Sequence, residues 1–302
     1  MPQIPLRLLP RLPSEAEIAR LSDWTLRVAG AVGQLPTPLD NLIAAARVQE
    51  VADPETWRDR YLASIPERAK AVFHLAWQKI RGIADLRERA VYVSQTATAS
   101  RIQFAKGHEL GHQMLPWHNV NLLYRDDDLS LSSEAQELFD AEANLFAAEV
   151  IFQGRRFRSQ ALDYQPSFDA VFLLADKHGA SKHATLRRYV EEHDEPIAMF
   201  PYWPSEYTLD MEGRPVLRLG KGVGSVSFVE KYAGAEPPGE LRSGDPWTTA
   251  REASAICNGH ITLKCGPDQF DFQWHAWWNS YCLLVMLRRR PVLHVIGRSL
   301  RT

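Results

Sequence analysis

The sequence has few cysteines, no strong excess of either charge and no long apolar run, and each of these absences excludes a class of protein. Its 302 residues contain three widely placed cysteines, an odd number that does not make a disulfide framework. The formal net charge of −2 creates no global basic field that would hold the chain on nucleic acid or on an acidic membrane. The longest late apolar run, residues 282–287, is too short to cross a bilayer.

These absences also predict a compartment. Four prolines interrupt the N-terminal segment of residues 1–13, so we expect no signal peptide there. The scattered cysteines are typical of a reducing environment. We therefore expect a cytoplasmic protein with no membrane partner and no direct binding to DNA.

The first two thirds of the chain carry strong helix signals, and 45% hydrophobic residues are enough to fill a core. Residues 14–81 are predicted to be helical, and Ser14 with Glu17 has the spacing of a capping box at their start. A short strand is predicted over residues 90–94. A helix over residues 98–115 follows it and ends before a proline.

The pattern changes near residue 200. A long helix over residues 133–153 and a helical pair over residues 168–193 precede this point. Prolines, glycines and short alternating runs follow it, and residues 270–275 alternate apolar and polar side chains as a strand does. We therefore predict an α+β protein, with a mainly helical domain over residues 1–199 and a smaller strand-rich domain over residues 200–302.

The segment FAKGHELGHQMLPWH, residues 104–118, has the composition of a metal site. On a helix, His108 and His112 lie one above the other on the same face, so their imidazoles can share one ion. Zinc binds histidine nitrogen at about 2.0–2.1 Å. Glu109 is about 100° round the helix, too far to join them comfortably as a ligand but close enough to take a proton from a water at the metal. This division of labour is that of a metal-dependent hydrolase.

Two features distinguish this helix from a surface helix with two solvated histidines, which is the alternative interpretation. The histidines share one face with Phe104 and Leu115, so they lie in an apolar stripe. Gly107 and Gly111 lie beside them, and each disfavours a helix by about 1 kcal/mol relative to alanine. Two glycines four residues apart predict that another backbone comes close to this helix.

A catalytic zinc usually has three protein ligands, so a third ligand is expected on an element that packs against the first helix. The best candidate is Glu142, since a carboxylate in the middle of an apolar face needs a partner. Its neighbours at three- or four-residue spacing are Leu138, Phe139, Leu145 and Phe146. Asp140 lies on the more polar side of the same helix, and Glu149 is the rival on the Glu142 face. We predict one Zn²⁺ per chain.

The segment 90–118, followed by EANLFAAE at residues 142–149, resembles the ImmA/IrrE family of metallopeptidases. Its members show a strand, a short loop, a helix with a histidine–glutamate–small–glycine–histidine motif, and a later motif of the form EANxFAAE. The resemblance implies a zincin-like fold of the gluzincin kind. By position it implies that His108, His112 and Glu142 are ligands and that Glu109 is the catalytic base.

The resemblance also implies a substrate class. Characterised members are cytoplasmic endopeptidases that cleave helix-turn-helix transcriptional repressors and so relieve repression. Members often place a third histidine directly after the motif, whereas Pro116 and Trp117 intervene here before His118. His118 or Tyr124 is a candidate to donate a hydrogen bond to the oxyanion.

Three other features have ordinary explanations. Residues 173–190 have the pattern of a helix-turn-helix, but the neutral net charge favours a helical pair packed on the core. The cysteines and histidine of residues 257–265 fit no standard zinc-finger spacing. The aromatic residues of 274–281 form either a ligand platform or the core of a small domain, and residues 200–302 receive no predicted role.

A second function remains open on the sequence alone. It is a regulatory protein that binds DNA or another protein and keeps a structural or vestigial zinc site. Such a protein hydrolyses no repressor, whereas a zinc endopeptidase does.

Overall fold

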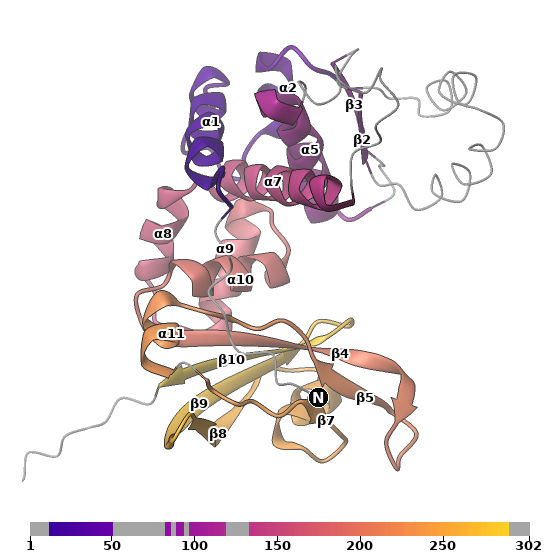
Figure 1. Cartoon of the computed structure of the whole chain (residues 1–302), viewed down its shortest axis with the longest axis vertical. Helices are drawn as coiled ribbons and strands as arrows, with labels where there is room; N and C mark the ends of the chain where they lie inside the picture. The colour runs from indigo at the N-terminus through magenta and orange to yellow at the C-terminus, as the bar shows by residue number, and fades with distance from the viewer. Residues whose placement is uncertain are drawn as a thin grey trace, which may run out of the picture. The chain divides into compact units, whose positions relative to one another are not determined.

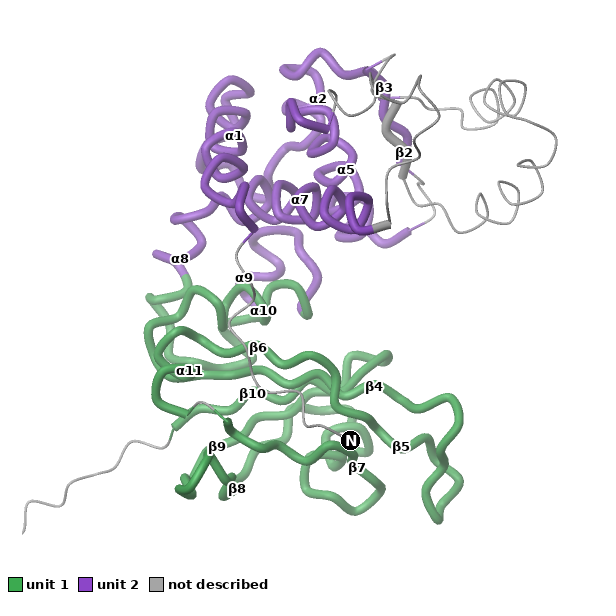
Figure 2. The backbone as a smooth tube through the Cα atoms, viewed as in Figure 1, with its two compact units in different colours: residues 1–10, 161–171, 183–302 green, residues 11–160, 172–182 purple. Residues whose placement is uncertain are grey.

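The computed structural model describes residues 12–50, 82–85, 89–93, 97–118, 133–232 and 234–289 (Figure 1). The chain divides into two compact units (Figure 2). The helical unit comprises residues 11–160 and 172–182, and the sheet unit comprises residues 1–10, 161–171 and 183–302. The fold therefore mixes helices and strands, as the sequence predicted.

The elements of the first two thirds of the chain are α1 (Glu15–Val28), α2 (Leu39–Ala45), β1 (Gln49–Glu50), β2 (Gly82–Asp85), β3 (Ala90–Val93), α5 (Ala99–Met114), α7 (Ser133–Phe152), α8 (Arg155–Leu162), α9 (Phe168–His178) and α10 (Lys182–Glu192). Those that follow are β4 (Ile197–Leu209), β5 (Pro215–Leu219), β6 (Val223–Gly224), α11 (Val226–Tyr232), β7 (Glu240–Leu241), the 3₁₀ helix η2 (Pro246–Thr248), α12 (Thr249–Ala253), β8 (Cys257–Cys265), β9 (Asp268–Trp278) and β10 (Leu283–Arg289).

The predicted elements around the histidine motif are confirmed. Strand β3 and helix α5 lie where the sequence placed a strand and a motif-bearing helix, and α7 fills the predicted 133–153 segment. The helical pair is present as α9 and α10, separated by Gly179 at a φ of +64°. The helical prediction for residues 14–81 holds for α1 and α2 but is wrong for residues 49–50, which form strand β1 beside β3, and its part over residues 51–81 lies outside the described residues.

A small sheet supports helix α5. Strand β3 lies between β1, which it pairs in parallel, and β2, which it pairs in antiparallel. Ala90, Val91 and Val93 of β3 are almost completely buried. Since α5 contacts both β2 and β3, one side of the motif helix rests on this sheet.

The start of α1 differs from the predicted capping box. Ser14 is at the N-cap position, but its side chain caps no backbone amide of the helix. Its hydroxyl donates a hydrogen bond to Glu142 on α7 instead, and Glu17 pairs with Arg20. The tertiary partner has therefore replaced the local one, and it ties the beginning of α1 to α7.

Helices α5 and α7 pack at very close range, as the two glycines predicted. A Cβ built on Gly107 would lie 3.1 Å from Ala147 Cβ, and one built on Gly111 would lie 3.1 Å from Ala143 Cα. Pairs of small residues four apart on both helices thus form the contact. Because no side chain larger than a methyl group lies between the two backbones at these glycines, polar side chains on the flanks of the two helices can reach one another.

The sheet unit is built on an antiparallel sheet in the order β7-β5-β4-β10-β9-β8, with β6 beside β4. One face of this sheet holds an apolar core that includes Phe200, Tyr202, Trp247, Phe272 and Trp274. The aromatic residues of 274–281 therefore differ in their surroundings. Trp274 is core, whereas Tyr281 is 63% exposed. They do not form a single ligand platform.

Strand β4 runs through the position at which the sequence predicted a domain boundary. It begins at Ile197, and its Pro201 and Pro204 stand opposite Leu284 of β10 and Leu217 of β5. In the structure, the sheet unit also takes residues 161–171 and the helical segment from His183 onward.

The cysteines of β8 are too far apart to share a metal ion. Cys257 and Cys265 are eight residues apart in one strand, so the rise per residue separates them by about 26 Å. All three cysteines are free thiols, and Cys265 and Cys282 are buried. This geometry agrees with the sequence interpretation, which found no zinc-finger spacing here.

The α5–α7 contact predicts the effect of adding a methyl group at Gly111. Alanine ordinarily stabilises a helix relative to glycine by about 1 kcal/mol. At Gly111 the added Cβ would meet Ala143 Cα and, at 3.2 Å, the Ala143 carbonyl oxygen, neither of which can move without shifting α7. We expect Gly111→Ala to lower the free energy of unfolding, measured by urea denaturation.

A matched pair of double mutants controls for helix propensity. In the double mutant Gly107→Ala/Ala147→Gly, the second change removes the atom nearest to the new Cβ, so it should restore part of the stability that Gly107→Ala loses. In Gly111→Ala/Ala143→Gly, the Ala143 atoms that meet the new Cβ belong to the backbone and remain, so the coupling energy between the two changes should be near zero. A Gly111→Ala variant more stable than wild type would contradict the close packing.

Candidate metal centre

Helix α5 brings the two motif histidines to one point. The Nε2 atoms of His108 and His112 are 3.2 Å apart, and the two rings meet at 83°. Two nitrogens bound to one zinc ion at tetrahedral angles lie about 3.3–3.4 Å apart. The distance between the two Nε2 atoms therefore suits a shared ion.

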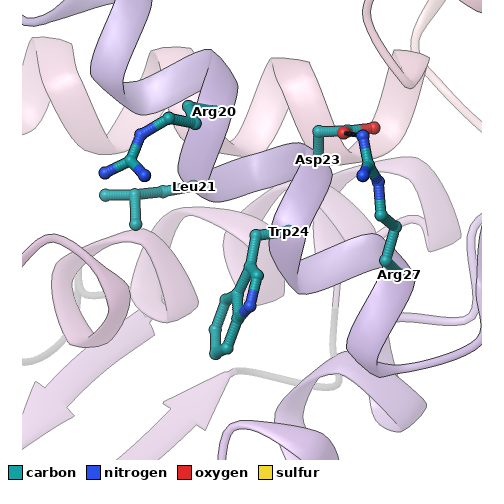
Figure 3. Close-up of a pocket in the computed structure, with 5 residues that line it drawn as sticks. All are labelled: Arg20, Leu21, Asp23, Trp24 and Arg27. Atoms are coloured by element: carbon teal, nitrogen blue, oxygen red, sulfur yellow. Dashed lines mark hydrogen bonds and ion pairs between the residues drawn. The ribbon is translucent and has the colours of Figure 1, made fainter.

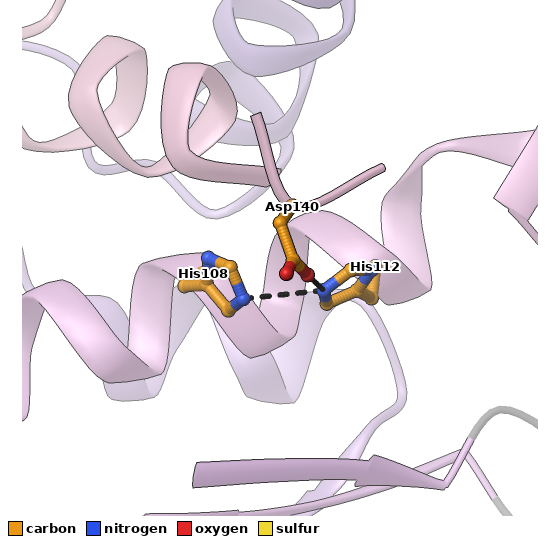
Figure 4. A group of neighbouring side chains, drawn as sticks. All are labelled: His108, His112 and Asp140. Atoms are coloured by element: carbon orange, nitrogen blue, oxygen red, sulfur yellow. Dashed lines mark hydrogen bonds and ion pairs between the residues drawn. The ribbon is translucent and has the colours of Figure 1, made fainter. Parts of the chain in front are cut away.

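Helix α7 adds a second pair of side chains at the same spacing. Asn144 Oδ1 is 3.0 Å from His108 Nδ1, and Asp140 Oδ1 is 3.8 Å from His112 Nε2. Among the described residues, His108, His112 and Asp140 form a group whose ligand atoms all lie within 4.8 Å of one another. Figure 4 shows the Asp140 carboxylate directed at the two facing ring nitrogens.

His112 is held from behind by a buried polar chain. Its Nδ1 is 3.0 Å from His118 Nδ1, and His118 Nε2 is 2.8 Å from Glu142 Oε2. Glu142 also accepts hydrogen bonds from Ser14 Oγ at 2.5 Å and from Trp117 Nε1 at 2.7 Å. His118 and Glu142 are 2% and 4% exposed, so this chain lies inside the helical unit.

Burial and hydrogen bonding set the charges of these groups. Burial alone would raise the pKa of Glu142, but its bonds from Ser14, Trp117 and His118 hold the pKa below the usual value. Burial lowers the pKa of His118 and of His108. Burial and the neighbouring His108 and His118 lower the pKa of His112 to about 3. The histidines are thus neutral near pH 7, which is the form that binds metals.

These charges show that the residues fit a cation. A carboxylate only accepts, so His118 Nε2 carries a proton and His118 Nδ1 accepts from His112 Nδ1. The Asn144 side-chain oxygen likewise accepts a hydrogen bond from His108 Nδ1, which carries the proton of that ring. Both Nε2 atoms are then bare lone pairs that face each other at 3.2 Å beside a carboxylate. A cation held about 2.0–2.1 Å from both nitrogens would replace this repulsion by coordination.

Glu109 lies beside the two histidines but in a different environment. It is 7% exposed, and burial, followed by the negative charge of Asp140, raises the pKa of its carboxyl to about 8. A carboxyl group with a pKa close to the working pH can both accept and release a proton.

The structure differs from the sequence prediction at the third ligand position. Asp140, and not Glu142, lies beside the histidines, because Glu142 is turned toward Ser14, Trp117 and His118. The rival Glu149 is not in the group either. One feature of the sequence points to Asp140. Asp140 and Asn144 are four residues apart, as His108 and His112 are, so two antiparallel helices can bring both pairs together.

The two candidate oxyanion donors have different outcomes. His118 has both ring nitrogens engaged, with His112 and Glu142, so it lies behind the histidine pair and has no free donor. Tyr124 lies outside the described residues.

A separate hollow on α1 offers no comparable chemistry. It is lined by Arg20, Leu21, Asp23, Trp24 and Arg27 (Figure 3). Arg20 is paired with Glu17 and Arg27 with Asp23, on the solvent-facing side of the helix. The hollow therefore combines surface ion pairs with an indole that is 53% exposed.

Comparison with known proteins supports the fold only. No protein-family model matches the sequence, and no curated protein matches it. A solved structure described as a Mycobacterium tuberculosis transcriptional regulator is similar, with a TM-score of 0.53 and 13% sequence identity. The similarity covers 91% of this chain and 76% of the regulator. Of the helices described here, none is long and apolar enough to span a bilayer.

The ligand geometry predicts which carboxylate matters most for metal binding. We expect Asp140→Ala to weaken zinc affinity by more than about 100-fold. The variant would lose a direct ligand, and even the loss of a partner that only orients a ligand costs about 10–100-fold. Glu137→Ala, an exposed carboxylate on the same helix, is the matched control and should leave affinity unchanged. Competition with a chromophoric chelator measures both. Equal affinities in the two variants would contradict the assignment of Asp140.

The environment of Glu109 predicts a pH dependence of the metal-free protein. A carboxyl whose folded pKa is raised from 4.5 to about 8 binds more protons in the folded than in the unfolded state between these values. Its contribution to stability therefore falls as pH rises through this window, by up to about 1.4 kcal/mol per unit. The unfolding free energy of wild type relative to Glu109→Gln should decline from pH 5 to pH 8. A flat difference would contradict the raised pKa.

Proposed function

We propose that this chain is a zinc-dependent endopeptidase. The observation that carries the proposal is the arrangement of two histidine Nε2 atoms and one carboxylate around a common point, with the buried Glu109 next to them in the motif. Three protein ligands with a position left for water are typical of catalytic zinc sites, whereas structural sites have four.

The donor set favours zinc over other metals. Two imidazoles and one carboxylate from His108, His112 and Asp140 suit zinc, whereas calcium and magnesium prefer oxygen ligands. When bound, the ion would supply a Lewis acid for the scissile carbonyl and would acidify a water. The helix with the histidine motif, the small supporting sheet and α7 are consistent with a zincin-like fold, in which Asp140 would take the place of the glutamate ligand that the gluzincin kind implies.

Glu109 would then move the proton. Its carboxylate accepts a proton from the attacking water as the water oxygen bonds to the carbonyl carbon. The protonated carboxyl then gives that proton to the amide nitrogen as the carbon–nitrogen bond breaks. In the metal-free chain, burial raises the pKa of this carboxyl, so it is a stronger base than an exposed glutamate.

Asn144 would keep the ligand geometry fixed. Its side-chain oxygen holds the Nδ1 proton of His108, so the Nε2 of that ring remains free to bind. The close contact of Gly111 with Ala143 sets the distance between the two helices, and therefore the distance from Asp140 to the histidines.

The substrate proposed is a helix-turn-helix transcriptional repressor in the cytoplasm. This part of the proposal rests on the likeness of the HELGH and EANLFAAE segments to the ImmA/IrrE family. A fold similar to that of a protein called a transcriptional regulator is compatible with work in gene regulation.

The alternative is a regulatory protein that binds DNA or a protein partner without hydrolysis, and the name of the structural neighbour favours it. The two arginines of α10 argue against DNA as the partner. Arg187 is paired with Glu191 and Arg188 with Glu192, so their charges are already compensated. Salt-sensitive DNA binding that survives removal of zinc by a chelator would establish this alternative.

Substitution of Glu109 tests the proposed mechanism. We expect Glu109→Gln to retain zinc and to lose hydrolysis by about 10²–10⁴-fold, since an amide cannot accept the proton. The assay follows cleavage of a helix-turn-helix repressor, with any that is encoded beside this gene tested first, by intact-protein mass spectrometry. Glu137→Gln is the matched control and should cleave as wild type does. Undiminished cleavage by Glu109→Gln would contradict the proposed role.

A further inference from the structure

The buried chain behind His112 has a direction. Trp117 Nε1 can only donate, and it donates to Glu142. The hydroxyl of Ser14 and the Nε2–H of His118 donate to the same carboxylate. His118 Nδ1 is then left as an acceptor, and the proton in its 3.0 Å contact with His112 belongs to His112 Nδ1.

The ring of His118 is also fixed in orientation. It stacks on the ring of Phe139 with a centroid distance of 4.3 Å and an interplanar angle of 29°. It is 2% exposed, so no water replaces a lost partner without local opening. Turning the ring over would exchange its nitrogens for carbons at both contacts and leave buried donors unpaired.

We propose that Glu142 and His118 are positioning residues of the metal centre, which hold His112 in the tautomer whose Nε2 is free to bind an ion. The inference rests on the proposed metal centre for its purpose, but the tautomers are a property of the metal-free chain. Ser14, at the start of α1, also donates to Glu142, so hydrogen bonds connect the start of α1 to His112 through Glu142 and His118.

This role differs from that of a ligand and from a purely structural one. A third ligand would have an oxygen beside His108 and His112, whereas both oxygens of Glu142 are occupied by donors on the far side of His112. A purely structural carboxylate would affect stability but not the tautomer of His112. The tautomer is therefore the informative measurement.

The first test needs no substitution. Long-range proton–nitrogen correlation spectra of the metal-free protein report which ring nitrogen of each histidine carries the proton. We expect His112 protonated at Nδ1 and His118 protonated at Nε2, both neutral. His112 protonated at Nε2, or His118 protonated at both nitrogens, would overturn the inference.

The second test compares zinc affinities by chelator competition. His118→Ala and Glu142→Ala should weaken binding by about 10–100-fold, the range for partners that orient a ligand. Glu142→Gln should lie closer to wild type, because an amide oxygen can still accept from Trp117 and His118 while Ser14 accepts from the amide nitrogen. Glu137→Ala is the control.

The outcomes separate this inference from the proposed function. Loss of binding in Glu142→Ala as severe as in Asp140→Ala would make Glu142 a ligand, and unchanged affinity in both alanine variants would remove its positioning role. Either result overturns the inference and leaves zinc binding by wild type intact. Failure of wild type to bind zinc overturns the proposed function, while the tautomers of the metal-free chain are still tested by the spectra. Circular dichroism identifies any variant that fails to fold.

Discussion

The close packing of α5 on α7 is the constraint on which the candidate centre depends. Gly107 and Gly111 face Ala147 and Ala143, and the absence of larger side chains lets the two backbones approach. Both helices place side chains at a four-residue spacing, so one register aligns two pairs at once. Asn144 meets His108, and Asp140 meets His112. Protein interiors pack at nearly crystalline density, so a small shift between the helices would not be absorbed locally.

The second requirement is the satisfaction of buried polar groups. Glu142 is almost fully buried and would be costly without partners, but three donors approach it. Ser14 lies at the N-cap of α1, whereas Trp117 and His118 both belong to the segment after α5. The carboxylate therefore joins segments that are distant in sequence, and the same network reaches a proposed metal ligand through His118.

The helices that carry the candidate site could be predicted from the sequence, whereas the third ligand position and strand β4 could not. The histidine helix, its glycines and the long helix α7 follow from local spacing. The third position does not, since an isolated carboxylate on an apolar face has the same pattern whether a metal or three hydrogen-bond donors satisfy it. The donors to Glu142 include Ser14, which is 128 residues away. Strand β4 could not be predicted because it contains Pro201 and Pro204. Proline has no backbone N–H to donate, so it usually argues against a central strand.

A crystal structure of the zinc-loaded protein, with data collected at the zinc absorption edge, tests the central claim most directly. The account predicts one anomalous peak in contact with His108 Nε2, His112 Nε2 and an oxygen of Asp140, each at about 2.0–2.2 Å. It also predicts that Glu142 keeps its bonds to Ser14, Trp117 and His118. A peak coordinated by Glu142, or no peak at the histidine pair after zinc has been supplied, would contradict it.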